Sequence, residues 1–213
     1  MKQMMLKRLL GCSLVLTLAS GILWAQDGPK VAHTNRSNAP ARKWTPPAGH
    51  PAIYTNLGPS TSNLYNDTTG YYVLAPSNSV GLGEQWIGLQ FTPRTNTSAT
   101  LLVAAVGIIS GTSRVDLGLY TDAGGTVGTL LAGGASTHIP VFGTCCGLVE
   151  VLIPATALTA GTPYWIAATT DDTNAADFTG VFESTNQSNI AFDPAQTGWL
   201  PFSGNVPAVG VFQ

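Results

Sequence analysis

Residues 85–92 read Gln-Trp-Ile-Gly-Leu-Gln-Phe-Thr, and their side chains alternate in character from one residue to the next. Ile87, Leu89 and Phe91 fall on one face, whereas Trp86 shares the other face with small and polar residues. Alternation with a period of two is typical of a β-strand that has one face in a hydrophobic core. This stretch therefore predicts a strand with an aliphatic inward face and with Trp86 pointing outward.

Similar runs follow along the chain. Residues 114–121 alternate strictly and place Tyr120 outward, whereas residues 101–109 are apolar on both faces, as in a central strand. Shorter runs bounded by Gly, Pro, Asn and Asp predict further strands at residues 71–74, 148–153, 164–170, 178–183, 190–192 and 206–212. No segment beyond the N-terminal region carries a sustained helical stripe. We therefore expect an all-β fold, an antiparallel β-sandwich of jelly-roll type.

The first 25 residues have the form of a secretory signal peptide. Lys2, Lys7 and Arg8 precede an uncharged, mostly apolar stretch from Leu9 to Ala25. A spanning helix needs about 20 apolar residues, and this stretch is shorter and interrupted by Gly and Ser, so a retained membrane anchor is the weaker alternative. We expect cleavage after Ala25, a mature chain without a transmembrane segment, and export to the cell surface, the extracellular space or the periplasm.

The rest of the chain divides by composition. Residues 26–52 are rich in Pro and predict a flexible lead-in, and residues 53–213 predict one sandwich domain. Hydrophobic residues make up 44% of the chain, which excludes a disordered protein. From residue 51 onward there are two basic and ten acidic residues. This balance excludes a nucleic-acid partner, because phosphate binding needs clustered Lys and Arg.

Three motifs in order carry a resemblance to a known family. They are residues 85–92, residues 119–125 (Leu-Tyr-Thr-Asp-Ala-Gly-Gly) and residues 158–165 (Leu-Thr-Ala-Gly-Thr-Pro-Tyr-Trp). Together they resemble the exported bacterial choice-of-anchor domains, over roughly residue 53 to the end. The resemblance implies a β-sandwich held at a cell surface and carries no catalytic residues with it. Residues 210–213 depart from the family pattern because they are strand-like, without a sorting signal, so we expect another means of attachment, or release.

Cys145 and Cys146 are adjacent and are the only cysteines beyond the signal peptide. An oxidising compartment favours disulfides, but neighbouring Cα atoms lie only about 3.8 Å apart, below the usual disulfide range of about 4.4–6.8 Å. A bond between them would force a tight turn, which Gly143 and Gly147 permit. We favour a structural turn or two inert thiols. The alternatives are a rigid surface turn that contacts a ligand, a redox switch, and disulfide bonds to another chain. Zinc binding together with His138 is a weaker alternative.

Oxygen-bearing side chains gather at Asp171, Asp172, Asn174 and Asp177. Calcium takes six to eight oxygen ligands, and such a loop can supply several of them. The spacing lacks the glycine and the terminal glutamate of an EF-hand. We favour a hairpin loop in which Asp and Asn stabilise turns, with no cofactor, and keep a calcium site as the alternative.

Aromatic residues on strands raise the question of sugar binding. Trp86 and Tyr120 both fall on the outward side of their strands, where a ring face is free to stack on a sugar. Aromatic residues are also common in strands simply because they bury a large area. Core packing is the better interpretation for Trp165, whereas Trp86 and Tyr120 are candidates for ligand contact.

Signs of catalysis are sparse. The sequence contains no G-x-S-x-G, H-E-x-x-H or P-loop motif. Glu84, Glu150 and Glu183 are carboxylates that could pair as acid and base, but the sequence does not fix their separation. We expect no enzyme but an exported interaction or structural module, whose partner is a polysaccharide or a cell-surface protein. A calcium-assisted carbohydrate-binding module is the first alternative and a glycoside hydrolase the second.

Overall fold

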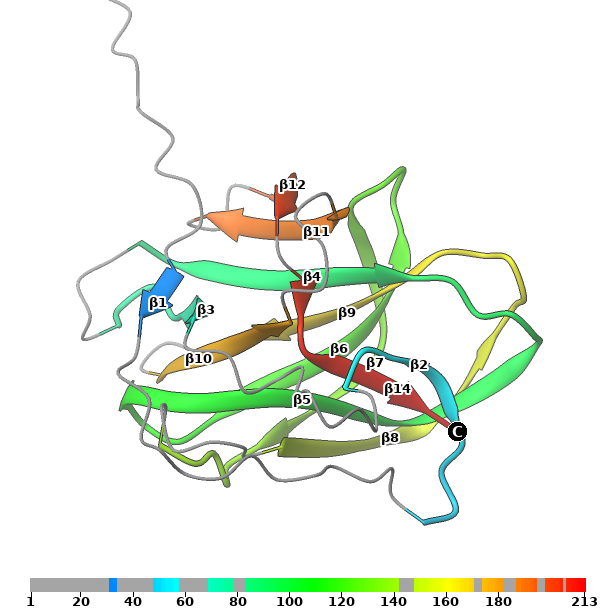
Figure 1. The fold of residues 1–213 in the computed structure, drawn as a ribbon, viewed down its shortest axis with the longest axis horizontal. Coiled ribbons are helices and arrows are strands. Elements are labelled where there is room, and N and C mark those ends of the chain that lie inside the picture. Colours follow the sequence, from blue (N-terminus) through cyan, green and yellow to red (C-terminus); the bar gives the residue numbers. More distant parts are fainter. Residues whose placement is uncertain are drawn as a thin grey trace, which may run out of the picture.

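The computed structural model describes residues 31–33, 48–57, 69–78, 83–141, 148–170, 174–181, 187–194, 198–204 and 206–213. Within these ranges every regular element is a β-strand, and the strands form two antiparallel sheets packed face to face (Figure 1). The predicted all-β sandwich is therefore confirmed.

The front sheet has the order β2-β14-β5-β8. Its strands are β2 (Ala52–Thr55), β14 (Val209–Phe212), β5 (Thr97–Gly111) and β8 (Leu148–Leu158). Val211, Leu102 and Val151 lie in register across three of these strands and are all buried. In β8 the two neighbours of Val151, Glu150 and Leu152, are exposed. One face of β8 therefore looks into the core and the other into solvent.

The back sheet has β4 near its centre. On one side of β4 the order is β9, β6 and β7, and on the other side β4 pairs with β11, which pairs with β12. These strands are β4 (Gln85–Phe91), β6 (Val115–Asp122), β7 (Val127–Ser136), β9 (Tyr164–Thr169), β11 (Gln187–Pro194) and β12 (Leu200–Gly204). The remaining strands are β1 (Val31–His33), β3 (Thr69–Leu74), β10 (Asn174–Val181) and β13 (Val206–Pro207).

Strand β5 belongs to both sheets. Its first part, Thr97–Ala105, pairs with β8 and β14, and its second part, Val106–Gly111, pairs with β10, which in turn pairs with β3. All residues from Leu101 to Val106 are buried. The prediction of a central strand that is apolar on both faces is therefore confirmed, and the same strand links the two sheets covalently.

The main core lies between the sheets and is lined by the residues that alternation placed inward. Ile87, Leu89 and Phe91 of β4 are at most 3% exposed and belong to this core, together with Leu117 and Leu119 of β6. Burying each of these side chains stabilises the fold by about 1.5–3 kcal/mol. The core thus fixes which face of the back sheet points outward.

Two regions differ from the sequence-based expectation. Strand β7 was not predicted, because its sequence mixes Gly and Ala with the exposed Leu130 and Leu131 and its pairing with β6 is interrupted by register shifts. Within the expected lead-in, Val31–His33 forms β1, antiparallel to β3, and Ala52 is the first residue of β2.

Candidate functional site

Tyr120 lies on the face of the back sheet that is turned away from the main core. Strand β9 lies between β4 and β6, so that Gln90 is opposite Trp165, and Trp165 is opposite Tyr120. Side chains in register on neighbouring strands share a face. Trp86 has the same strand parity as Gln90, but its half-buried side chain also packs against the main core.

A second hydrophobic cluster forms on this outward surface. Its buried centre consists of Trp165, 1% exposed, and Val127, 5% exposed, and the half-buried Tyr120 and Trp199 pack against them. Trp86 extends the cluster, because its ring centroid lies 6.3 Å from that of Trp199 at an angle of 46°. We call these five residues the outer aromatic cluster. The predicted burial of Trp165 is confirmed, but the residue is buried here and not between the sheets.

Glycines beneath the cluster let its side chains lie against the sheet. A Cβ atom on Gly118 would lie 2.5 Å from Cε2 and 2.8 Å from the hydroxyl oxygen of Tyr120. A Cβ atom on Gly88 would lie 2.9 Å from a methyl group of Val127. Glycine within a strand often marks such a close approach. The Tyr120 ring therefore lies against Gly118 and keeps part of its surface in solvent, since the residue is only half-buried.

Asp122, at the end of β6, fixes the position of the buried indole. Its carboxylate accepts hydrogen bonds from Trp165 Nε1 at 2.8 Å and from Gln90 Nε2 at 2.7 Å. It also accepts from the backbone N–H groups of Gly124 at 3.1 Å and Gly125 at 3.0 Å. Both glycines have positive φ angles, as a tight turn here requires. The predicted turn after β6 thus positions an acceptor for the cluster.

The charge state of Asp122 follows from these contacts. Burial raises the pKa of its carboxyl group, but the hydrogen bonds from Trp165, Gly125, Gln90 and Gly124 together lower it by more. The net result is a pKa below the ordinary value for aspartate, since each bond favours the ionised form. Asp122 is therefore a structural anion at neutral pH and does not serve as a proton donor.

Two other polar groups belong to the cluster. The pKa of the Tyr120 hydroxyl is raised, first by burial and second by the negative charge of Asp116, so it stays protonated at neutral pH. The Nε1–H group of Trp86 is buried and has no hydrogen-bond partner among the described residues. An unsatisfied buried donor costs about 1–3 kcal/mol, so this N–H group lowers the stability of the packed cluster.

The other predicted site residues are only partly described. Cys145, Cys146, Asp171 and Asp172 lie outside the described residues. Asn174 and Asp177 belong to β10, where the backbone of Asp177 pairs with that of Tyr72 and Gly107. In the described part of the chain, no group of three His, Cys, Asp or Glu residues is placed to hold a metal ion. The calcium and cysteine predictions thus remain predictions.

The three glutamates considered as an acid–base pair do not meet in the part that can be described. Glu84 is buried immediately before β4 of the back sheet, and Glu150 is exposed on the outer side of β8 in the front sheet. Glu183 lies outside the described residues. His138, the residue considered with the cysteines, is exposed and lies beside the Thr137 hydroxyl.

Sequence reasoning missed the roles of Asp122 and Gln90. Asp122 was interpreted only as a turn residue, and Gln90 only as a polar residue on an outward face. The sequence offers one hint, because Gln90 lies on the same face of its strand as Trp86 and Asp122 begins an Asp-Ala-Gly-Gly turn. The pairing of β9 between β4 and β6 brings them together, and short motifs do not specify that order.

Comparison with known proteins leaves the family open. No family model matches the sequence, and no curated protein matches it either. The resemblance to choice-of-anchor domains therefore remains a prediction. Among the described residues there is no helix long and apolar enough to cross a membrane.

Proposed function

We propose that this chain is an exported, non-catalytic binding domain that holds a saccharide on the outer aromatic cluster. The single observation that carries the proposal is the packing of the half-buried Trp199 and Tyr120 around the buried pair Trp165 and Val127, with the half-buried Trp86 beside Trp199. Partly exposed rings at fixed positions are suited to stacking on the apolar faces of sugar rings. The signal peptide predicted for residues 1–25 supports export.

The rigidity of the cluster supports binding. Asp122 holds Trp165 by a charge-assisted bond, and the neighbouring turn holds Asp122 by two backbone N–H groups. A surface whose side chains are already ordered loses little conformational entropy when a ligand binds. Aromatic residues also dominate the binding energy of many interfaces. The cluster therefore has the properties of a preformed platform and not of a surface that orders on contact.

The test is a thermal melt of the purified protein against neutral polysaccharide fragments, each with calcium and with a chelator. A ligand that binds only the folded state raises stability by about 2.7 kcal/mol at a hundredfold excess over its dissociation constant. Trp199→Ala and Tyr120→Ala should weaken the binding of an active fragment at least about tenfold, a loss of about 1.4 kcal/mol.

The matched control is Leu152→Ala. Leu152 is 74% exposed and lies on β8 of the front sheet, so its truncation removes exposed apolar surface far from the cluster. This variant should bind like the unchanged protein. If no fragment binds, or if Leu152→Ala weakens binding as much as Trp199→Ala, the saccharide proposal is wrong and a protein partner becomes the better hypothesis. A rise that needs calcium would connect binding to the predicted Asp171 loop.

A further inference from the structure

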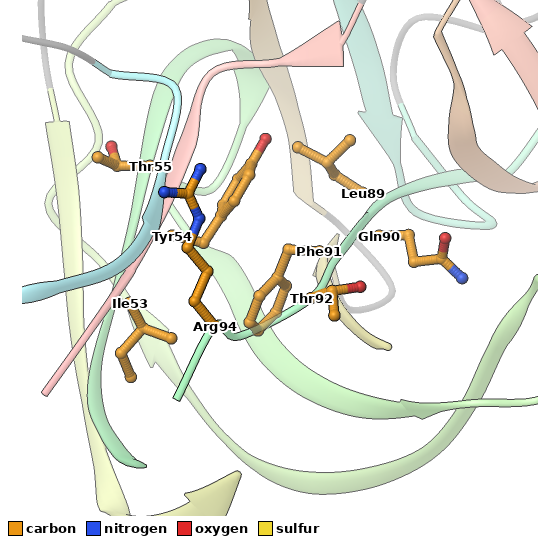
Figure 2. A pocket seen from close by; sticks show the side chains of 8 residues that line it. All are labelled: Ile53, Tyr54, Thr55, Leu89, Gln90, Phe91, Thr92 and Arg94. Carbon is orange, nitrogen blue, oxygen red and sulfur yellow. The ribbon is translucent and has the colours of Figure 1, made fainter. Parts of the chain in front are cut away.

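A cavity opens at one end of the sandwich, between the edge strand β2 of the front sheet and the end of β4 in the back sheet (Figure 2). Its volume is about 470 Å³, within the range of about 300–1,000 Å³ that is usual for small-ligand sites. Tyr54 and Thr55 of β2 line one side, and Phe91, Thr92 and Arg94 line the other. The cavity shares none of the five residues of the outer aromatic cluster, although Gln90 on its lining also donates to Asp122, which holds Trp165.

Aromatic packing makes one wall of the cavity rigid. The ring centroids of Tyr54 and Phe91 are 5.5 Å apart, and those of Phe91 and Tyr164 are 6.2 Å apart. Both distances lie within the range for favourable aromatic pairs. Tyr164 is held in turn, because its hydroxyl oxygen accepts a hydrogen bond from the backbone N–H of Thr159 at 3.1 Å. The apolar side of the cavity is therefore preformed.

The segment that carries Arg94 is held on both sides. The carbonyl oxygen of Pro93 accepts a hydrogen bond from the N–H of Gly161 at 3.0 Å, and the side-chain oxygen of Asn96 accepts one from the N–H of Ala160 at 2.8 Å. These bonds tie the turn after β4 to the turn before β9. Figure 2 shows the Arg94 side chain extending along the cavity toward Tyr54 and Thr55.

Arg94 is distinctive in its charge environment. Of the two arginines in the described part of the chain, Arg114 forms an ion pair with Asp116 at 2.9 Å, whereas no described carboxylate pairs with Arg94. No Asp or Glu is among the described residues that line the cavity. The domain from residue 51 onward is otherwise acidic, with two basic and ten acidic residues. A guanidinium that no described carboxylate pairs with, at a preformed cavity of an acidic domain, is suited to a specific anion.

We propose that this cavity binds a sugar acid, with the Arg94 guanidinium holding the carboxylate and the half-buried Tyr54 ring, packed on the buried Phe91, contacting the sugar ring. Guanidinium and carboxylate match in a planar, two-bond geometry. The hydroxyls of Thr55 and Thr92 are the neighbouring polar groups on the lining. The choice of a sugar acid over other carboxylates rests on the proposed saccharide function, whereas the anion site itself does not.

The test is calorimetric titration with trigalacturonate and with its methyl ester, which has the same ring skeleton without the charge. The acid should bind at least about tenfold more tightly than the ester, because a hydrogen bond to a charged partner contributes more than a neutral one. Arg94→Gln should remove that difference. Arg94→Lys should restore part of it, since lysine keeps the charge but not the fork.

Arg114→Gln is the matched control, because it removes the same charge from the arginine that already has a partner. It should bind trigalacturonate like the unchanged protein, and thermal melts should show that both variants fold. Equal binding of acid and ester, unchanged binding in Arg94→Gln, or no binding of trigalacturonate would each overturn the proposal. Binding of N-acetylphenylalanine through Arg94 in place of trigalacturonate would overturn the sugar acid and identify a peptide carboxylate as the occupant.

The outcome is separable from that of the proposed function. Trp199→Ala and Tyr120→Ala alter the outer aromatic cluster and leave the cavity lining unchanged. Loss of neutral-saccharide binding in those variants, with Arg94-dependent binding of trigalacturonate retained, would show two independent sites. Binding of trigalacturonate that depends on Trp199 and not on Arg94 would assign it to the cluster and refute the cavity site.

Discussion

Asp122→Ala should destabilise the fold far more than its position at a strand end suggests. The substitution leaves Trp165 Nε1 without its acceptor in a side chain that is 1% exposed. It also removes the bond from Gln90, whereas the N–H groups of Gly124 and Gly125 are exposed and can bond to water. A hydrogen bond to a charged group contributes about 1.5–3 kcal/mol, and a stranded buried donor costs about 1–3 kcal/mol.

The contribution of the bond and the cost of the unpaired donor overlap, so we expect the free energy of unfolding to fall by about 3 kcal/mol in total. In a domain of this size, a loss of 1 kcal/mol lowers the melting temperature by about 2–4 °C, so the variant should melt about 6–12 °C lower. Urea unfolding followed by tryptophan fluorescence measures the free energy directly. Asp116→Asn is the control on the same strand, since its ion pair with the half-exposed Arg114 should contribute less than about 1 kcal/mol.

A double-mutant cycle with Trp165→Phe tests the cause. Phenylalanine lacks the indole N–H, so Asp122→Ala should cost about 1–2 kcal/mol less in that background than in the unchanged protein. A loss below about 1 kcal/mol for Asp122→Ala alone, or an equal loss in both backgrounds, would refute the assignment of Asp122 as the group that holds the cluster.

Three further outcomes follow from the same structure. The pKa of Asp122 is lowered in the folded state, so its stabilising effect is complete above the unfolded pKa of about 3.9 and is lost as the pH falls through the folded pKa. In Asp122→Asn, the free energy of unfolding should therefore depend less on pH below about pH 4. Gly118→Ala should displace the Tyr120 ring from its packed position at a cost of about 1–3 kcal/mol, and should bring the pKa of Tyr120 back toward 10, measured by absorbance titration; an unchanged titration would contradict the close approach. Phe212→Ala empties a fully buried position and should cost about 3–5 kcal/mol in urea unfolding, and a loss under about 1 kcal/mol would show that β14 packs less tightly than described.

Local pattern was sufficient to predict much of the fold. Strict alternation identified β4 and β6 and the correct inward faces, since burial of Ile87 and Leu117 depends only on the period of the strand. Strand β7 escaped prediction because Leu130 is 53% exposed, so apolar character does not mark an inward face there. The register shifts beside Tyr120 disrupt the period further.

The candidate site was predictable only in part, for a topological reason. The alternation places Tyr120 on the outward face as predicted, because direction is a local property, whereas Trp86 also packs against the main core. Their connection is not local: it requires β9 to lie between β4 and β6, and Trp199, which precedes β12, to reach the same surface. The sequence did not mark Arg94 as a candidate binding residue. Its proposed role depends on β2, a strand far earlier in the chain that forms the opposite wall of the cavity.

Strand β14 also determines when the molecule can fold. It lies between β2 and β5 in the front sheet, although roughly a hundred residues separate it from β5 and about a hundred and fifty from β2 in the sequence. Contacts of such long sequence separation form slowly, because loop-closure entropy is lost before the pairing stabilises the chain. A nascent chain that has not yet reached Val209 can assemble hairpins of the back sheet, such as β6 with β7, but cannot close the front sheet. The front sheet therefore closes only after synthesis has passed β14, and a chain that ends before Val209 lacks the strand that joins β2 to β5.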